Sequence, residues 1–372
     1  MSIDRRVTAS GQVRYRVRVK AHGRVVASRT FERRTDAREW ERDQLTHLHQ
    51  GDWVDPRRGR ISLALMAESW LLTRGGVKRR TRETDELMWR LYIEPVFGTR
   101  RIATITTAEI SEWAGALVAG GKSAATSRRA LATLRGILSH AVADERLIRN
   151  AAASAIRPRG GAVREGQVIE PVEVRKLAAA CAGKYADVVT LLAYTGMRWG
   201  ELAGLQVGDR IRVPGSGLRL QRAAIAGGGS GDVYIDTLKD HEARTIPLVP
   251  QAASVVDRWV QGRDADEWLF PSANGTPLSE GNWKRSVKWS AAKVAIKRPT
   301  FRVHDLRHTA ASIWLASGAD PKVVQRILGH ASAAMTMDPY GHLIDRSLWD
   351  AAKRIGGISG ASDVNDRKDR NG

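Results

Sequence analysis

Residues 302–342, with the sequence RVHDLRHTAASIWLASGADPKVVQRILGHASAAMTMDPYGH, concentrate the reactive side chains of the chain. His304 and Arg307 stand three residues apart in a segment with helical spacing, and Tyr340 follows His330 by ten residues. Arginine presents a planar fork to phosphate oxygens, histidine can move a proton near neutral pH, and tyrosine can act as a nucleophile. The stretch therefore suits chemistry on a phosphate group.

The composition of the whole chain favours a polyanionic partner. The chain has 372 residues, enough for two or three domains, and 42% of them are apolar, which argues against wholesale disorder. Sixty Lys and Arg face 40 Asp and Glu, a net charge of +20. Nucleic acid is the first candidate for the partner, and a membrane surface is the alternative. The charge is spread as +7, +7 and +6 over residues 1–60, 61–160 and 161–372, so it is densest in the first two segments.

Two classes of protein are excluded by simple patterns. The sequence has no run of about 18 apolar residues that could span a bilayer. Its N-terminal residues have no apolar segment typical of a signal peptide. A single cysteine, Cys181, leaves no internal disulfide and no cysteine-based metal cluster, and its Ala-rich surroundings predict a buried thiol. We expect a cytoplasmic, nucleoid-associated protein.

Residues 1–55 are predicted to form a small β-sheet module with one helix. Residues 13–20 alternate with period two, a returning strand is expected over 25–31, and a helix from Thr35 onward. One strand face carries apolar residues and the other carries only cations, namely Arg14, Arg16, Arg18 and Lys20. A solvated face is the alternative, but four neighbouring cations repel one another, so we favour contact with DNA.

Residues 61–156 are predicted to form a helical module. Ser62 is expected to cap a first helix, Thr106 and Glu109 fit a capping box, and residues 123–143 show a helical core face. A basic turn at 78–80 is expected to precede a second helix over 83–93. Candidate DNA-contacting residues on this module are Lys78, Arg79, Arg80, Lys122, Arg128 and Arg129.

Residues 157–166 form a predicted linker, and residues 167–355 form the largest module, followed by a tail over 356–372. Helices are expected over 172–181, 185–194, 251–261, 282–296 and 304–355, and strands over 210–213, 218–222, 233–238 and 243–248. The run Gly227–Gly231 invites comparison with a phosphate-binding loop, but no helix follows it, so we interpret it as a hairpin loop.

Two distant residues extend the reactive set. Arg198 lies in TGMRWGEL (195–202) and Lys239 in TLKDHEARTIPL (237–248), at the predicted turn of a hairpin. Taken singly, Arg198 could pair with Glu201 at a helix end and Lys239 could be an exposed surface lysine. Glu201 itself is interpreted as structural, bonding the backbone near Arg198.

Five strings in this order resemble the tyrosine recombinase (phage integrase) family: TGMRWGEL, TLKDHEARTIPL, HDLRHT, LGH and MDPYGH. The resemblance implies an α+β, mainly helical fold in which an arm-binding module, a core-binding module and a catalytic domain with a small antiparallel sheet follow one another. It implies DNA cleavage through a 3′-phosphotyrosine, without metal or ATP. Its site residues would be Tyr340 as the nucleophile, Arg198 and Arg307 as the phosphate clamp, His304 and His330 for hydrogen bonds and proton handling, and Lys239 as the donor to the leaving oxygen.

The resemblance also implies partners. These are double-stranded DNA carrying attachment sites, three further copies in a homotetramer, and accessory factors that bend DNA or set direction. The arm module favours phage or prophage integration over resolution of chromosome dimers. Two departures from the family pattern are visible: ten rather than nine residues separate His330 from Tyr340, and Pro339 directly precedes the tyrosine. An apolar stripe over 343–355 could pack on its own subunit or on a neighbour.

Three other functions were weighed against this one. His304 and His308, at positions i and i+4, could bind zinc from one helix face, but no third ligand or general-base glutamate accompanies them. A DNA-binding protein with a vestigial site would not need the complete reactive set. A type IB topoisomerase shares the chemistry but does not need separate basic modules for site recognition.

Overall fold

The computed structural model describes residues 2–21, 24–50, 54–55, 57–160, 166–227, 233–237 and 243–329. The chain divides into two compact units, residues 1–163 and 164–372. The described part is mainly helical with small antiparallel sheets, so the predicted α+β fold class is confirmed.

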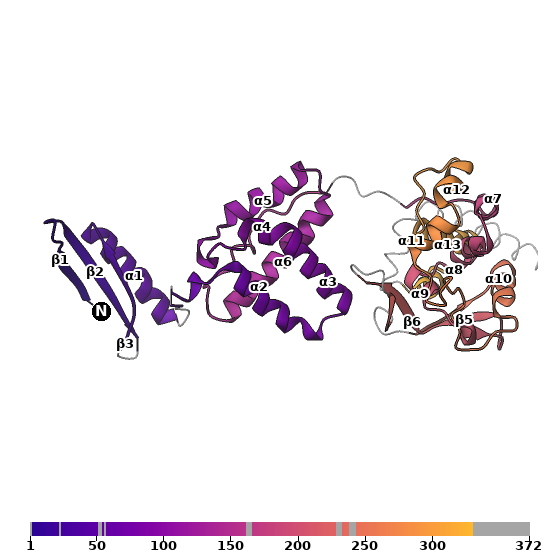
Figure 1. Cartoon of the computed structure of the whole chain (residues 1–372), viewed down its shortest axis with the longest axis horizontal. Coiled ribbons are helices and arrows are strands. Elements are labelled where there is room, and N and C mark those ends of the chain that lie inside the picture. The colour runs from indigo at the N-terminus through magenta and orange to yellow at the C-terminus, as the bar shows by residue number, and fades with distance from the viewer. Residues whose placement is uncertain are drawn as a thin grey trace, which may run out of the picture. The chain divides into compact units, whose positions relative to one another are not determined.

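The N-terminal sheet has three antiparallel strands in the order β1-β2-β3 (Figure 1). These are β1 (Ser2–Val7), β2 (Val13–Ala21) and β3 (Arg24–Phe31), and helix α1 (Arg34–Gln50) packs against the last two. Val17 and Val19 are buried, as the period-two alternation predicts. Strand β1 was not predicted, because its sequence SIDRRV has no apolar alternation and its register with β2 is set by backbone pairing.

A helical domain occupies the rest of the first unit. Its elements are α2 (Leu63–Leu72), α3 (Arg79–Met88), a π-helical segment over Trp89–Ile93, α4 (Glu94–Phe97), α5 (Thr107–Ala119) and α6 (Ala124–Ala143). The predicted N-cap at Ser62 and the Thr106–Glu109 capping box are confirmed, and Ser123 is found to cap α6. Apolar side chains of all these helices share one core, to which α6 contributes Leu131, Leu134, Ile137 and Leu138.

The predicted basic turn at 78–80 is wrong, because Arg79 and Arg80 lie inside α3. Cations are unfavourable near the positive end of a helix dipole. Here Glu83 compensates: its Oε1 lies 2.9 Å from Arg79 Nε and its Oε2 lies 3.7 Å from Arg80 Nη1. Such i,i+4 and i,i+3 pairs stabilise a helix.

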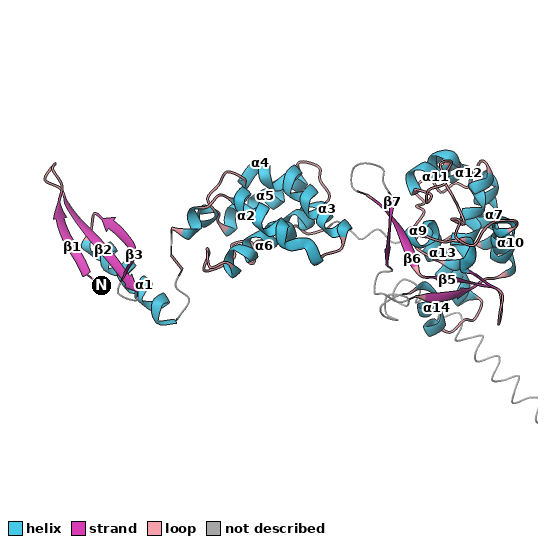
Figure 2. Cartoon of the chain, turned by 60° about the horizontal axis from the view of Figure 1, so that its bottom comes forward, coloured by secondary structure: helices cyan, strands magenta, loops and turns pink. Residues whose placement is uncertain are grey.

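The C-terminal unit combines helices with two small sheets (Figure 2). Its helices are α7 (Pro171–Ala180), α8 (Asp187–Thr195), α9 (Trp199–Ala203), α10 (Pro250–Val260), α11 (Glu280–Ser286), α12 (Trp289–Ala295), α13 (Asp305–Ala316) and α14 (Pro321–Leu328). Its strands are β4 (Arg210–Ile211), β5 (Gly217–Leu220), β6 (Arg222–Ala226), β7 (Val233–Thr237) and β8 (Arg244–Pro247). Helices α7, α10 and α13 pack around the apolar α8, where Phe270, Trp283 and Phe301 are fully buried.

The strand order corrects two predictions. Residues 218–222 are not one strand, since β5 ends at Leu220 and the unpredicted β6 begins at Arg222. β6 pairs with β7, so the run Gly227–Gly231 does connect a hairpin, whereas β8 joins the other sheet beside β5. The segment holding Lys239 therefore links two sheets and is not a hairpin turn.

Two predicted long helices are divided. The helix expected over 282–296 breaks at Lys288, whose φ of 52° lies in the left-handed region. The helix expected from His304 onward ends at Ala316 and resumes as α14. Residues 330–372, including the C-terminal tail, lie outside the described residues.

Cys181 is buried, and burial raises the pKa of its thiol to about 11, as expected of an unreactive core cysteine.

Candidate active site

A tight turn between α8 and α9 positions Arg198. Gly196 ends α8 with a φ of 64°, a conformation that residues with a Cβ adopt at a cost. A Cβ built on Gly196 would also lie 2.3 Å from Cδ2 of Leu328. The turn therefore requires glycine on two counts, and it places Arg198 directly before the first residue of α9.

Glu201 anchors Arg198 from one turn further along α9. The backbone N–H of Arg198 donates to Glu201 Oε2 at 2.8 Å, and Arg198 Nη1 donates to Glu201 Oε1 at 3.0 Å. Arg198 Nη2 donates to the carbonyl oxygen of Gly329 at 3.0 Å. The interpretation of Glu201 as a structural residue that bonds the backbone near Arg198 is confirmed.

The pairing with Glu201 does not consume Arg198. A guanidinium has five N–H donors, and the bonds to Glu201 and Gly329 use two of them. The Arg198 side chain is 36% exposed, whereas the carboxylate beneath it is 3% exposed. Arg198 is thus fixed by Glu201 and Gly329 and can still present N–H donors to a ligand.

A second arginine, Arg244 on β8, binds the same carboxylate and was missed by the sequence reasoning. Its Nη1 and Nη2 donate to Glu201 Oε1 and Oε2 at 3.0 and 2.8 Å. Burial raises the pKa of Glu201, but the bonds and charges of Arg244 and Arg198 outweigh it, and the pKa lies below its usual value. The sequence signal for Arg244 was a cation on a short apolar strand, within the string TLKDHEARTIPL that resembles the family.

Arg307, on α13, is tied to the same turn as Arg198. Its side chain is buried, with 5% of the residue exposed, and its Nη1 donates to the carbonyl oxygen of Gly196 at 2.6 Å. Gly196 precedes Arg198 by two residues. The structure therefore brings together the two arginines that were predicted to clamp a phosphate.

His304 and His308 lie at the start of α13 with their rings edge to face, 5.5 Å between centroids. Burial is the main cause that lowers the pKa of both imidazoles, and the charges of Arg302 and Arg307 lower it further. Both rings are thus biased toward the neutral form. Among the residues that the structure describes, no group of three His, Cys, Asp or Glu is arranged to hold a metal ion.

Three predicted site residues, Lys239, His330 and Tyr340, lie outside the described residues. Their chain neighbours are described. Lys239 falls between Thr237, where β7 ends, and Arg244, where β8 begins. His330 directly follows Gly329, whose carbonyl oxygen Arg198 binds.

The predicted cationic face of the N-terminal sheet is partly neutralised by its neighbours. Arg14 forms an ion pair with Glu32, and Arg18 with Asp4 of β1. Arg16 Nε donates to Ser28 Oγ at 3.0 Å, and Lys20 is exposed. The strand face itself carries only cations, as predicted, but Asp4 of β1 and Glu32, directly after β3, reduce their mutual repulsion.

The DNA-contact candidates of the helical domain are also bonded within the chain. Arg129 Nη2 lies 2.6 Å from Oδ1 of Asp85, a buried carboxylate that also binds Arg74. Arg128 Nη1 donates to the carbonyl oxygen of Pro158 at 3.1 Å, and Lys122 Nζ lies 6.0 Å from the centroid of the Tyr92 ring. Contact of any of these residues with DNA remains a prediction.

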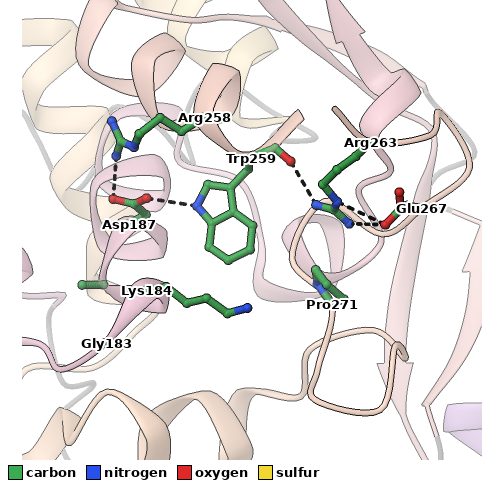
Figure 3. Close-up of a pocket in the computed structure, with 9 residues that line it drawn as sticks. Gly183, Lys184, Asp187, Arg258, Trp259, Arg263, Glu267 and Pro271 are labelled. Carbon is green, nitrogen blue, oxygen red and sulfur yellow. Dashed lines mark hydrogen bonds and ion pairs between the residues drawn. The ribbon is translucent and has the colours of Figure 1, made fainter. Parts of the chain in front are cut away.

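A pocket of about 560 Å³ on the C-terminal unit contains none of the predicted site residues (Figure 3). Its wall is the Trp259 ring, which stacks on Tyr185 at 5.6 Å. Asp187 accepts from Arg258 Nη2 at 2.8 Å and from Trp259 Nε1 at 3.0 Å, while Arg263 pairs with Glu267. The carboxylates that line the pocket are thus already engaged.

Family models match both units of the chain. The phage integrase family model covers residues 167–346, and the model of the N-terminal SAM-like domain of phage integrases covers residues 63–118. The integrase of Mycobacterium phage D29 is 27% identical over 331 residues, or 84% of this chain and 85% of that protein. A putative prophage phiRv2 integrase of Mycobacterium tuberculosis is 28% identical over 330 residues, or 85% of each chain.

Solved structures share the fold. The Tn1549 transposon integrase in complex with transposon right-end DNA matches with a TM-score of 0.66 and 22% identity, over 80% of this chain and 100% of that one. A lambda integrase tetramer bound to a Holliday junction matches with a TM-score of 0.54 and 18% identity, over 88% and 96% of the chains.

The arginine cluster and the two-unit fold therefore belong to a DNA recombinase of the tyrosine class. The chain is a member of the phage integrase family and a tyrosine-type site-specific recombinase. Within the described part of the chain, none of the helices is long and apolar enough to cross a membrane.

Proposed function

We propose that this recombinase integrates and excises phage or prophage DNA through a covalent 3′-phosphotyrosine formed by Tyr340. One observation carries the proposal. Arg198 and Arg307 are tied to a single turn at Gly196, and Arg198 also reaches the carbonyl of Gly329, the residue before His330. The resemblance of relatives named as phage and prophage integrases supports the biological setting.

The proposed reaction is a transesterification. The phenol oxygen of Tyr340 attacks the scissile phosphorus, the P–O5′ bond breaks, and the 5′-oxygen takes a proton from Lys239. The phenol proton passes to a neutral imidazole, a role for which His304 is suited by its lowered pKa. The products are a 3′-phosphotyrosine and a free 5′-hydroxyl, and rejoining is the reverse reaction. Because the bond energy is kept in the ester, neither ATP nor a metal is required.

Arg198 and Arg307 serve as the phosphate clamp in this scheme. Negative charge on the non-bridging oxygens grows in the transition state, and preorganised donors stabilise it without reorganising. Both guanidinium groups are preorganised, Arg198 by Glu201 and Gly329 and Arg307 by Gly196.

We further propose that the protein acts as a homotetramer on two DNA duplexes in the cytoplasm, in association with the nucleoid. The lambda integrase named as a tetramer on a Holliday junction supports this assembly, and so does the net charge of +20. The cationic residues of the N-terminal sheet and the helical domain would contact DNA. Accessory factors that bend DNA or set the direction would complete the assembly.

The test is covalent trapping on a nicked suicide substrate. Wild type, incubated in EDTA with DNA that contains the attachment core sought in the sequence flanking the gene, should form an adduct visible on a denaturing gel. Tyr340→Phe should form none while binding the same DNA. The matched control is Tyr234→Phe, which changes a tyrosine on β7 and should leave the adduct unchanged.

Three results would count against the proposal. An adduct that persists in Tyr340→Phe would place the nucleophile elsewhere. Intact DNA binding without any adduct on a verified core site would favour a DNA-binding protein with a vestigial site. Cleavage that requires added metal would overturn the metal-free mechanism.

A further inference from the structure

All three nitrogens of the Arg244 guanidinium donate hydrogen bonds to the protein. Its two terminal nitrogens bind both oxygens of Glu201, at 3.0 and 2.8 Å, and its Nε donates to the carbonyl oxygen of Ile327 at 3.0 Å. Its side chain is 13% exposed, against 36% for Arg198 on the same carboxylate. Arg244 therefore lacks the outward face that a phosphate ligand needs.

These contacts fix the end of α14. Ile327 lies in the last turn of that helix, and Gly329 ends it with a φ of 66°. A Cβ on Gly329 would lie 2.9 Å from Cζ of Arg244, so the guanidinium packs directly against this glycine. Arg198 Nη2 donates to the carbonyl oxygen of Gly329. Arg198 and Arg244, which share the buried Glu201, thus hydrogen-bond the last residues before His330.

The same arginine is fixed to the sheet. Arg244 pairs with Leu220 in the register of β8 with β5, and α14 packs against β8. Lys239 precedes Arg244 by five residues. The side chain of Arg244 therefore lies between the Glu201–Arg198 pair and the end of α14.

We infer that Arg244 is a positioning residue for strand cleavage, which acts through Glu201 and Gly329 to align Arg198 with the end of α14. This inference rests on the proposed function. It assigns to Arg244 no contact with DNA, in contrast to Arg198, which has donors left for a phosphate.

The experiment compares cleavage with DNA binding in Arg244→Lys, which keeps the charge but not the three-point fork. The rate of adduct formation at saturating suicide substrate should fall by about 100-fold, because small displacements of catalytic groups cost that much. The Kd for the same DNA should stay within about twofold, and the salt dependence of binding should keep its slope, because no phosphate contact is lost.

A double-mutant cycle tests the route through Glu201. Glu201→Gln alone should slow the adduct strongly, and Glu201→Gln combined with Arg244→Lys should be close to the slower single variant, because residues that act as a unit are not additive. Gly329→Ala offers a second route, since its Cβ would displace Arg244, and it should also slow cleavage with binding intact.

The matched control is Arg210→Lys. Arg210 is another buried arginine of this unit, 8% exposed, which binds both oxygens of Asp257 at 3.0 and 3.2 Å. It should be folded and cleave like wild type. Wild-type cleavage by Arg244→Lys or Gly329→Ala, additive effects in the cycle, or a salt slope reduced by about one in Arg244→Lys would each overturn the inference. Failure of wild type itself to form an adduct would instead overturn the proposed function.

Discussion

Arginines are held in two different ways in the N-terminal sheet and around Glu201 in the C-terminal unit. In the N-terminal sheet, Arg14 and Arg18 pair with Glu32 and Asp4, and these four side chains are 32–74% exposed. In the C-terminal unit, the shared partner Glu201 is 3% exposed and binds two arginines at once. The same residue types thus form surface pairs in the N-terminal sheet and a buried cluster around Glu201.

The difference in burial determines what each arrangement can do. A surface ion pair contributes about 0–1 kcal/mol, so water or a phosphate can replace its carboxylate at little cost. A buried carboxylate cannot be left without its cations, because an unpaired buried charge costs several kcal/mol. The exposed pairs of the sheet are therefore suited to exchange a carboxylate for DNA, whereas the buried cluster is suited to fix geometry for chemistry.

The largest effect is expected from Arg198→Lys. Lysine keeps the positive charge, but it cannot donate to Glu201 and Gly329 and also present a fork to a phosphate. Adduct formation on the suicide substrate should fall by about 100-fold or more, with DNA binding changed only a few-fold. Single-turnover gels and anisotropy titrations measure the two quantities.

Arg258→Lys is the matched control for this prediction. Arg258 lies in the same unit and pairs with Asp187, but its side chain is 59% exposed. It should cleave at the wild-type rate. Equal loss in both variants would mean that replacing any arginine of this unit by lysine impairs cleavage, and the contrast between buried and exposed pairs would fail.

An intermediate effect is expected from acid. His304 and His308 have lowered pKa values, mainly through burial and then through nearby charges, so the unfolded chain binds protons more readily than the folded one. Above the ordinary imidazole pKa of about 6.5, the two imidazoles should therefore not lower the free energy of unfolding. This free energy should decline as the pH falls through and below that value. Urea unfolding between about pH 8 and 5 measures this slope.

His308→Gln sharpens the acid prediction, because it removes one of the two groups. The variant should lose less stability on acidification than wild type. Near pH 8, where the imidazoles are neutral, the difference between the two proteins in the free energy of unfolding should not change with pH. His308 is the better choice of the two, since it has no assigned role in cleavage. An unchanged slope would show that these imidazoles do not account for the acid sensitivity of the C-terminal unit.

The sequence predicted the local elements better than their meeting points. Caps such as Ser62 and the Thr106–Glu109 box depend on residues within one turn, so their spacing alone suffices. Strand β1 was missed because its pairing with β2 is a backbone property. The helix over 282–296 was predicted without a break, because the left-handed backbone conformation of Lys288 leaves no signal in the composition.

The candidate site shows the same limit. Arg198 and Arg307 could be predicted because each stands in a recognisable string, and the structural role of Glu201 follows from its three-residue spacing to Arg198. Arg244 stood inside a quoted string and was still overlooked. Its importance comes from Ile327 and Gly329, which are more than eighty residues away in the chain and meet it only after folding.

The smallest effect is expected in the N-terminal sheet, from Arg14→Gln. Because Arg14 and Glu32 form an exposed pair, the free energy of unfolding should change by less than about 1 kcal/mol. If Arg14 contacts a phosphate, the slope of log affinity against log salt should fall by about one on DNA that carries the arm sites. Arg38→Gln, an exposed cation on α1, is the matched control and should leave the slope nearly unchanged. Equal slopes in both variants would show that the cationic face of the sheet is only a solvated surface. A loss of stability well above 1 kcal/mol would show that its pairs resemble those of the buried cluster.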